Sequence, residues 1–66
     1  MGKMTEEELL SIIDRYGYDL IDEGGCFRAK RRHSRYVLSE ISPLFIGDRY
    51  WQVKRIAVWI MEREKD

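Results

Sequence analysis

A short basic segment carries the residue types that most clearly indicate a binding chemistry. Residues 27–36 read FRAKRRHSRY. A guanidinium group forms forked, charge-assisted hydrogen bonds to phosphate oxygens, so a row of arginines can follow a nucleic-acid backbone. On a helix, arginines spaced i, i+3, i+4 and i+7 share one face. We therefore predict a nucleic-acid-binding helical face made of Arg28, Lys30, Arg31, Arg32 and Arg35.

The charge of the whole chain argues against a dedicated nucleic-acid binder. Twelve basic side chains balance twelve acidic ones, and the isoelectric point is about 6.6, so there is no overall basic excess. Residues 1–25 contain seven acids and two bases, whereas residues 26–42 contain five bases and one acid. The acidic first segment is therefore a second candidate partner for the arginines, within one chain or between subunits.

The two tryptophans suggest a different function. On a helix, Trp51, Val58 and Trp59 fall outside the sector that the neighbouring apolar residues define. Tryptophan and arginine dominate many protein–protein interfaces. The alternative function is therefore a protein–protein interaction module, as a regulator, inhibitor or assembly factor, that uses these three residues with an arginine rim. The competing explanation is that this helix is buried on nearly all sides.

Candidate catalytic and metal-binding residues do not form a working set. Cys26 and His33 are seven residues apart, which is about 10 Å along a helix and too far for direct proton transfer. One cysteine and one histidine also fall short of the four ligands of a structural zinc site. Asp19, Asp22 and Glu23 lack the spacing of an EF-hand. We therefore expect a non-enzymatic protein with no cofactor and no metal.

The elements that would position these residues begin with an amphipathic helix. Thr5 and Glu8 have the spacing of a capping box. Apolar residues then recur at intervals of three and four as far as Leu20. The pattern predicts one helix from residue 5 to residue 22, which continues through Gly17 and ends at the glycine pair of residues 24–25.

The middle segment is compatible with two structures. A helix over residues 26–41 separates the arginines from an apolar face, and we favour it. The alternative is a hairpin with strands at residues 26–32 and 36–41 that turns at residues 33–35. Ser42 and Pro43 end either structure, and a short apolar loop follows at residues 44–47.

A third helix completes the predicted fold. Asp48 is a suitable N-cap, and residues 49–65 contain an apolar sector with helical spacing. The strand-forming residues within this segment fit a long edge strand almost as well. The predicted fold is an all-α, three-helix bundle, and the alternative is an α+β domain with a central hairpin over residues 26–41.

The length of 66 residues allows a single small domain, residues 1–66. Such a domain needs additional stabilisation, and a single cysteine cannot form an internal disulfide, so we expect a homodimer. No apolar run approaches the roughly 18 residues of a membrane span, and no secretory leader pattern opens the chain. An unpaired cysteine suits a reducing compartment, so we expect a cytoplasmic protein without a membrane partner.

Overall fold

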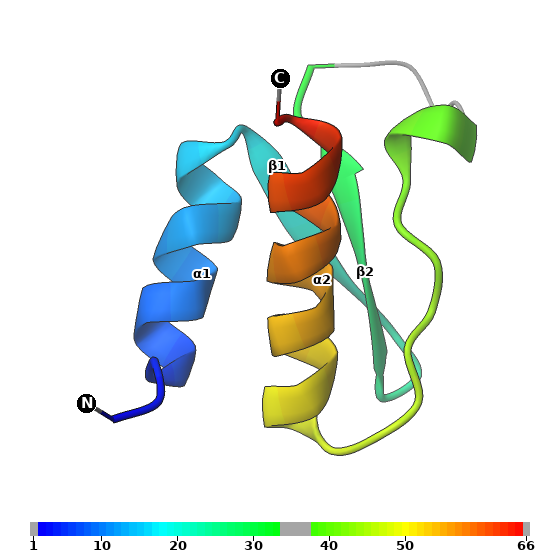
Figure 1. Cartoon of the computed structure of the whole chain (residues 1–66). Helices are drawn as coiled ribbons and strands as arrows, with labels where there is room; N and C mark the ends of the chain where they lie inside the picture. The colour runs from blue at the N-terminus through cyan, green and yellow to red at the C-terminus, as the bar shows by residue number, and fades with distance from the viewer. Residues whose placement is uncertain (1, 34–37, 66) are drawn as a thin grey trace.

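The computed structural model describes residues 2–33 and 38–65 and shows an α+β arrangement. The elements are helix α1 (Glu6–Arg15), strands β1 (Tyr18–Glu23) and β2 (Cys26–Arg31), the short 3-10 helix η1 (Leu38–Glu40) and helix α2 (Arg49–Arg63). The two strands form an antiparallel hairpin. Both α-helices lie side by side on one face of this hairpin, with their N-terminal ends at the same end of the molecule (Figure 1). The three-helix bundle predicted from the sequence is therefore wrong.

Helix α1 starts where it was predicted and ends much earlier. Thr5 and Glu8 form the capping box through reciprocal hydrogen bonds. The helix ends at Arg15, with Tyr16 as its C-cap, and Gly17 follows with a φ of 87°. Glycine adopts this left-handed backbone conformation at little energetic cost, and the conformation ends the helix. The predicted continuation to residue 22 is therefore wrong, because Gly17 ends the helix.

The glycine pair of residues 24–25 forms a hairpin turn. Gly24 and Gly25 have φ values of 68° and 93°, as a two-residue type I′ turn requires. This turn pairs Glu23 with Cys26 and sets the register of the whole hairpin. The predicted helix over residues 26–41 is therefore wrong. The α+β alternative has the right class but the wrong pairing, because the partner of β2 precedes it in the chain.

Helix α2 confirms the predicted third helix and supplies half of the core cluster. Asp48 caps it by accepting a hydrogen bond from the Trp51 amide at 2.8 Å. The buried residues of α2 pack between α1 and the inner face of the hairpin, where Ala29 is fully buried. The core cluster consists of Leu9, Ile13, Tyr18, Ala29, Val53, Ile56, Ala57 and Ile60.

Two buried polar residues connect the hairpin to the rest of the fold. The Gln52 side chain accepts a hydrogen bond from the Phe27 amide at 2.8 Å and donates one to the Gly47 carbonyl at 2.8 Å. Ser42 accepts a hydrogen bond from the Ala29 amide through its hydroxyl and returns one from its own amide to the Ala29 carbonyl. These bonds cover the outer edge of β2, so the segment before α2 is attached to the hairpin.

Candidate functional site

The predicted arginine face does not form, because its residues lie on and beside a strand. Side chains alternate between the two faces of β2. Arg31 shares the inner face with buried Ala29, whereas Arg28 and Lys30 lie on the outer face. Arg32 follows the end of the strand, and Arg35 lies outside the described residues. The strand therefore divides residues that a helix would have placed together.

Two of these arginines are bound to acids from the first part of the chain. Arg28 forms an ion pair with Glu23 across the hairpin, with 3.0 Å between Nε and Oε1. Arg32 reaches Asp14 at 2.8 Å and Asp19 at 3.0 Å, and its guanidinium also donates to the Tyr18 carbonyl. The acidic first segment is thus an intramolecular partner of the basic segment.

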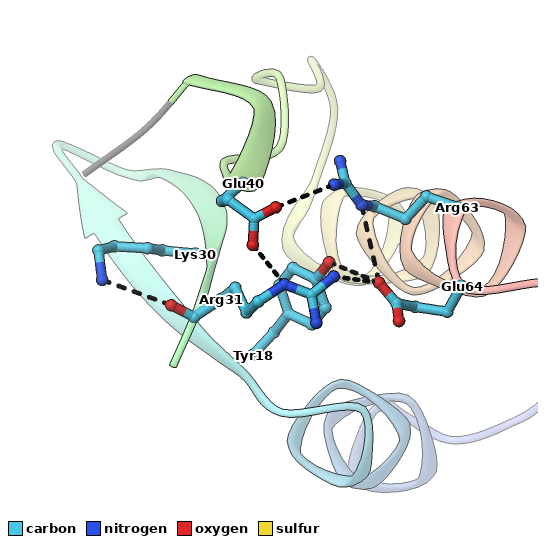
Figure 2. Close-up of polar contacts among 6 residues, drawn as sticks. All are labelled: Tyr18, Lys30, Arg31, Glu40, Arg63 and Glu64. Carbon is cyan, nitrogen blue, oxygen red and sulfur yellow. Dashed lines mark hydrogen bonds and ion pairs between the residues drawn. The ribbon is translucent and has the colours of Figure 1, made fainter. Parts of the chain in front are cut away.

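Arg31 is the centre of a third set of ion pairs, which we call the carboxylate clasp. Figure 2 shows its guanidinium over the Tyr18 ring and between two carboxylates. It pairs with Glu40 of η1 and with Glu64, which follows α2. The Tyr18 hydroxyl donates to Glu64 at 3.1 Å, and Arg63 contacts Glu40 at 3.4 Å and Glu64 at 3.8 Å. The clasp consists of Tyr18, Arg31, Glu40, Arg63 and Glu64.

The protonation states of Glu64 and Tyr18 in the clasp fit a role in stabilising the fold. The hydrogen bond from Arg31, followed by that from Tyr18, lowers the pKa of Glu64 below its usual range. Burial, and then the hydrogen bond to Glu64, raises the pKa of Tyr18. At neutral pH the carboxylate is therefore ionised and the phenol is protonated. A catalytic acid or base needs a pKa near the working pH, and both shifts move away from neutrality.

The three predicted interface residues separate in the structure. Trp59 is partly buried and packs edge-to-face on Tyr18, with 6.0 Å between ring centroids, while Arg63 covers it at 4.7 Å. Val58 is partly buried, and Trp51 remains 45% exposed. Trp51 and Val58 are seven residues apart, so they share one side of α2. Only Trp51 of the three is a large exposed apolar side chain.

The loop before α2 adds exposed residues that the sequence-based prediction of an interface missed. Ile46 is 93% exposed and Leu44 is 43% exposed, and both lie in the apolar loop noted in the sequence. Phe45 is partly buried between them. We call Leu44, Phe45, Ile46 and Trp51 the apolar patch. The sequence does contain a signal for this patch, which is the run of three apolar residues at positions 44–46. A loop needs no apolar side chains to form a helix or strand face.

Arg55 joins the two aromatic rings of the patch. Its guanidinium carbon lies 5.5 Å from the centroid of the Phe45 ring and 5.7 Å from that of Trp51. Trp51 in turn packs directly on Gly47, where an added Cβ would lie 2.4 Å from the indole. The patch is therefore held by packing within the loop and the first two turns of α2.

Other candidate sites are less developed. Cys26 begins β2 and His33 lies two residues beyond its other end. The strand alone spans roughly 16 Å at about 3.3 Å per residue, so the two side chains cannot act together. Within residues 2–33 and 38–65, no group of three or more His, Cys, Asp or Glu side chains could hold a metal ion. A shallow hollow of about 340 Å³ between the helices is lined by Ile12, Arg15, Tyr16 and Met61.

Comparisons with known proteins do not identify a relative. The chain matches no protein-family model, no curated protein and no solved structure. In the part of the chain that the structure describes, no helix is both long enough and apolar enough to cross a membrane.

Proposed function

We propose that this chain is a small, non-catalytic protein-binding module whose contact surface is the apolar patch. The observation that carries the proposal is Ile46, an aliphatic side chain that is 93% exposed and immediately precedes Gly47, on which the half-exposed Trp51 packs. Burial of apolar surface releases about 25 cal/mol per Å², so covering these side chains favours association. Single exposed apolar residues are ordinary, but here Leu44 and Ile46 are exposed on either side of a partly buried Phe45, in the loop that contacts Trp51 through Gly47.

The patch is arranged before any partner binds. The Asp48 cap fixes the start of α2, and the Gln52 side chain holds the Gly47 carbonyl. Trp51 is wedged between Gly47 and Arg55. A surface whose side chains are already ordered loses less conformational entropy on binding. Tryptophan and arginine at the centre of such a surface also match the composition of energetic hot spots.

Nucleic-acid binding through the basic segment remains a prediction that this arrangement does not favour. Arg28, Arg31 and Arg32 each contact at least one carboxylate of the same chain. A phosphate backbone would have to displace those carboxylates, which reduces the net gain from each contact. We therefore place a protein partner first, and the exposed tryptophan with nearby arginines supports that order.

A matched pair of exposed residues tests the proposal. The full chain, an Ile46→Ser variant and a Tyr16→Ser variant are immobilised and exposed to an extract of the source cells treated with nuclease. Tyr16 is 43% exposed at the other end of the molecule, so it controls for the loss of an exposed apolar side chain. Quantitative mass spectrometry should find proteins retained by the wild-type chain and Tyr16→Ser but lost with Ile46→Ser.

Two results would contradict the proposed function. Proteins retained alike by all three chains would exclude the apolar patch as the contact surface. Anisotropy of labelled duplex DNA, single-stranded DNA and structured RNA provides a second test at low and moderate salt. Salt-sensitive binding that an Arg31→Glu, Arg32→Glu variant loses would establish the nucleic-acid function in place of the proposed one.

A further inference from the structure

Arg55 differs from five other arginines of the fold in its charge environment. Arg28, Arg31, Arg32, Arg49 and Arg63 each contact a carboxylate of this chain. Among residues 2–33 and 38–65, no carboxylate lies within ion-pair distance of Arg55. Its neighbours are instead the rings of Phe45 and Trp51. The guanidinium is therefore oriented by aromatic contacts while its hydrogen-bond donors remain available to solvent.

The charges around the apolar patch leave this end of α2 positive. Lys54 precedes Arg55 and likewise has no ion pair among the residues that the structure places. Asp48, seven residues before Arg55, uses its carboxylate to cap α2. Glu62 lies seven residues beyond Arg55, which is about 10 Å along the helix. A carboxylate that approaches the patch would thus meet Arg55 with little competition.

The rings also give Arg55 a defined direction. A guanidinium over aromatic faces gains cation–π energy and loses part of its conformational freedom before binding. Arginine pairs with a carboxylate through two parallel hydrogen bonds, and such bonds are stronger than neutral ones. The half-exposed Trp51 lies next to this donor, and the aliphatic Ile46 immediately precedes Gly47, on which Trp51 packs. The surface therefore offers one apolar contact and one anion contact side by side.

We infer that the partner presents an acidic peptide segment in which an aspartate or glutamate adjoins a large apolar side chain. The carboxylate pairs with Arg55, and the apolar side chain covers Ile46 and Trp51. This inference rests on the proposed function and names the chemistry of its partner. A nucleic acid fits less well, because its affinity comes from several phosphate contacts, whereas Arg55 and Lys54 provide two. Trp51 could stack on one base, but the more exposed Ile46 has no ring.

A random peptide library displayed on phage tests this inference with the full chain as the target. Selected peptides should be enriched in Asp or Glu beside Leu, Ile, Phe or Trp. The best peptide and its amide version, with each acid replaced by Gln or Asn, are then labelled and titrated by fluorescence anisotropy. The variants are Arg55→Gln, Ile46→Ser and, as the matched control, Arg15→Gln, which lies at the end of α1.

The outcomes test the acidic partner and the apolar patch separately. The amide peptide should bind the wild-type chain about tenfold or more weakly, as expected for a lost charged hydrogen-bond pair. Arg55→Gln should bind both peptides equally, and Arg15→Gln should behave as wild type. Equal binding of both peptides to the wild-type chain would overturn the acidic partner, while loss with Ile46→Ser would still support the patch. Selection of no Ile46-dependent peptide would overturn both proposals.

A nucleic-acid arm completes the test. A labelled single-stranded oligonucleotide is titrated against the wild-type chain and Arg55→Gln at the same salt concentrations. The inference expects no binding that depends on Arg55. An oligonucleotide that binds through Arg55, together with peptides that do not, would overturn the acidic peptide as the partner. Circular dichroism of each variant confirms that the helices are retained.

Discussion

The two ends of α2 carry similar side chains in opposite arrangements. At the C-terminal end, Arg63 covers Trp59 and Arg31 covers Tyr18, and both guanidinium groups contact carboxylates of the chain. At the N-terminal end, Arg55 covers Phe45 and Trp51 without such a carboxylate among the described residues. The same arginine–aromatic contact therefore stabilises the fold at one end and leaves a donor for another molecule at the other.

The difference also concerns where apolar surface is covered. Tyr18 is 1% exposed beneath the clasp, whereas Ile46 projects almost wholly into solvent beside the patch. The clasp connects β2, η1 and the end of α2 (Figure 2), so its ion pairs have a structural task. Of the four patch residues, Phe45 alone packs against the core cluster, and none of them takes part in the clasp. Substitutions at the two ends should therefore separate stability from binding.

The largest expected effect is the loss of the Tyr18 ring. Tyr18→Ala removes a buried ring that packs on Trp59 and lies under Arg31, so we expect a loss of about 3–5 kcal/mol in the free energy of unfolding. Urea denaturation followed by circular dichroism measures it. Tyr18→Phe keeps the ring and should lose far less. A loss below about 1 kcal/mol for Tyr18→Ala would mean that the clasp end is not part of the core.

The second effect concerns the junction between the loop and α2. Gly47 has a φ of 147°, and a Cβ there would lie 2.4 Å from the Trp51 indole. Gly47→Ala should cost about 1–3 kcal/mol through backbone strain and should displace the indole, which changes tryptophan fluorescence. Gly2→Ala is the control, because nothing lies within 4 Å of its added Cβ. Unchanged stability and fluorescence in Gly47→Ala would show that Trp51 is not wedged there.

The helix starts could be predicted from sequence because they depend on local contacts. Thr5, Glu8 and Asp48 bond to amides within three residues, and the structure confirms both starts. The sequence predicts the wrong structure for the middle of the chain, because its arginines have helical spacing while Phe27, Arg28, Ala29 and Lys30 also alternate as in a strand. The deciding signal was Gly24–Gly25, which was interpreted as a helix exit and forms a hairpin turn.

The site could be predicted only in part, for a different reason. Acids near the arginines were foreseen as partners because opposite charges in one short chain attract at any geometry. Which apolar residues stay exposed depends on which face of α2 meets the hairpin, and that depends on the strand pairing. Trp59 packs on Tyr18, the first residue of β1, and residues 41–42, just before the loop that carries Ile46, bond to β2.

The third effect is a pH dependence that arises at Glu64 in the clasp. Arg31 lowers the pKa of Glu64 in the folded chain below its usual value of 4.5. The stabilisation is therefore fully present above that value and is lost as the pH falls through the lowered pKa. Stability of the wild-type chain should decline more steeply in acid than that of Glu64→Gln, measured by urea denaturation across pH 3–6. Parallel curves would show that Arg31 does not hold this carboxylate.

The smallest expected effect is that of Ile46→Ser on folding. Its side chain is almost fully exposed, and substitutions at such positions change the free energy of unfolding by no more than about 0.5 kcal/mol. The same variant should lose the Ile46-dependent partner, so binding and stability separate at one residue. A loss above about 1 kcal/mol in urea denaturation would show that Ile46 packs within the fold. In that case the patch would be part of the core, and the contrast between the ends of α2 would disappear.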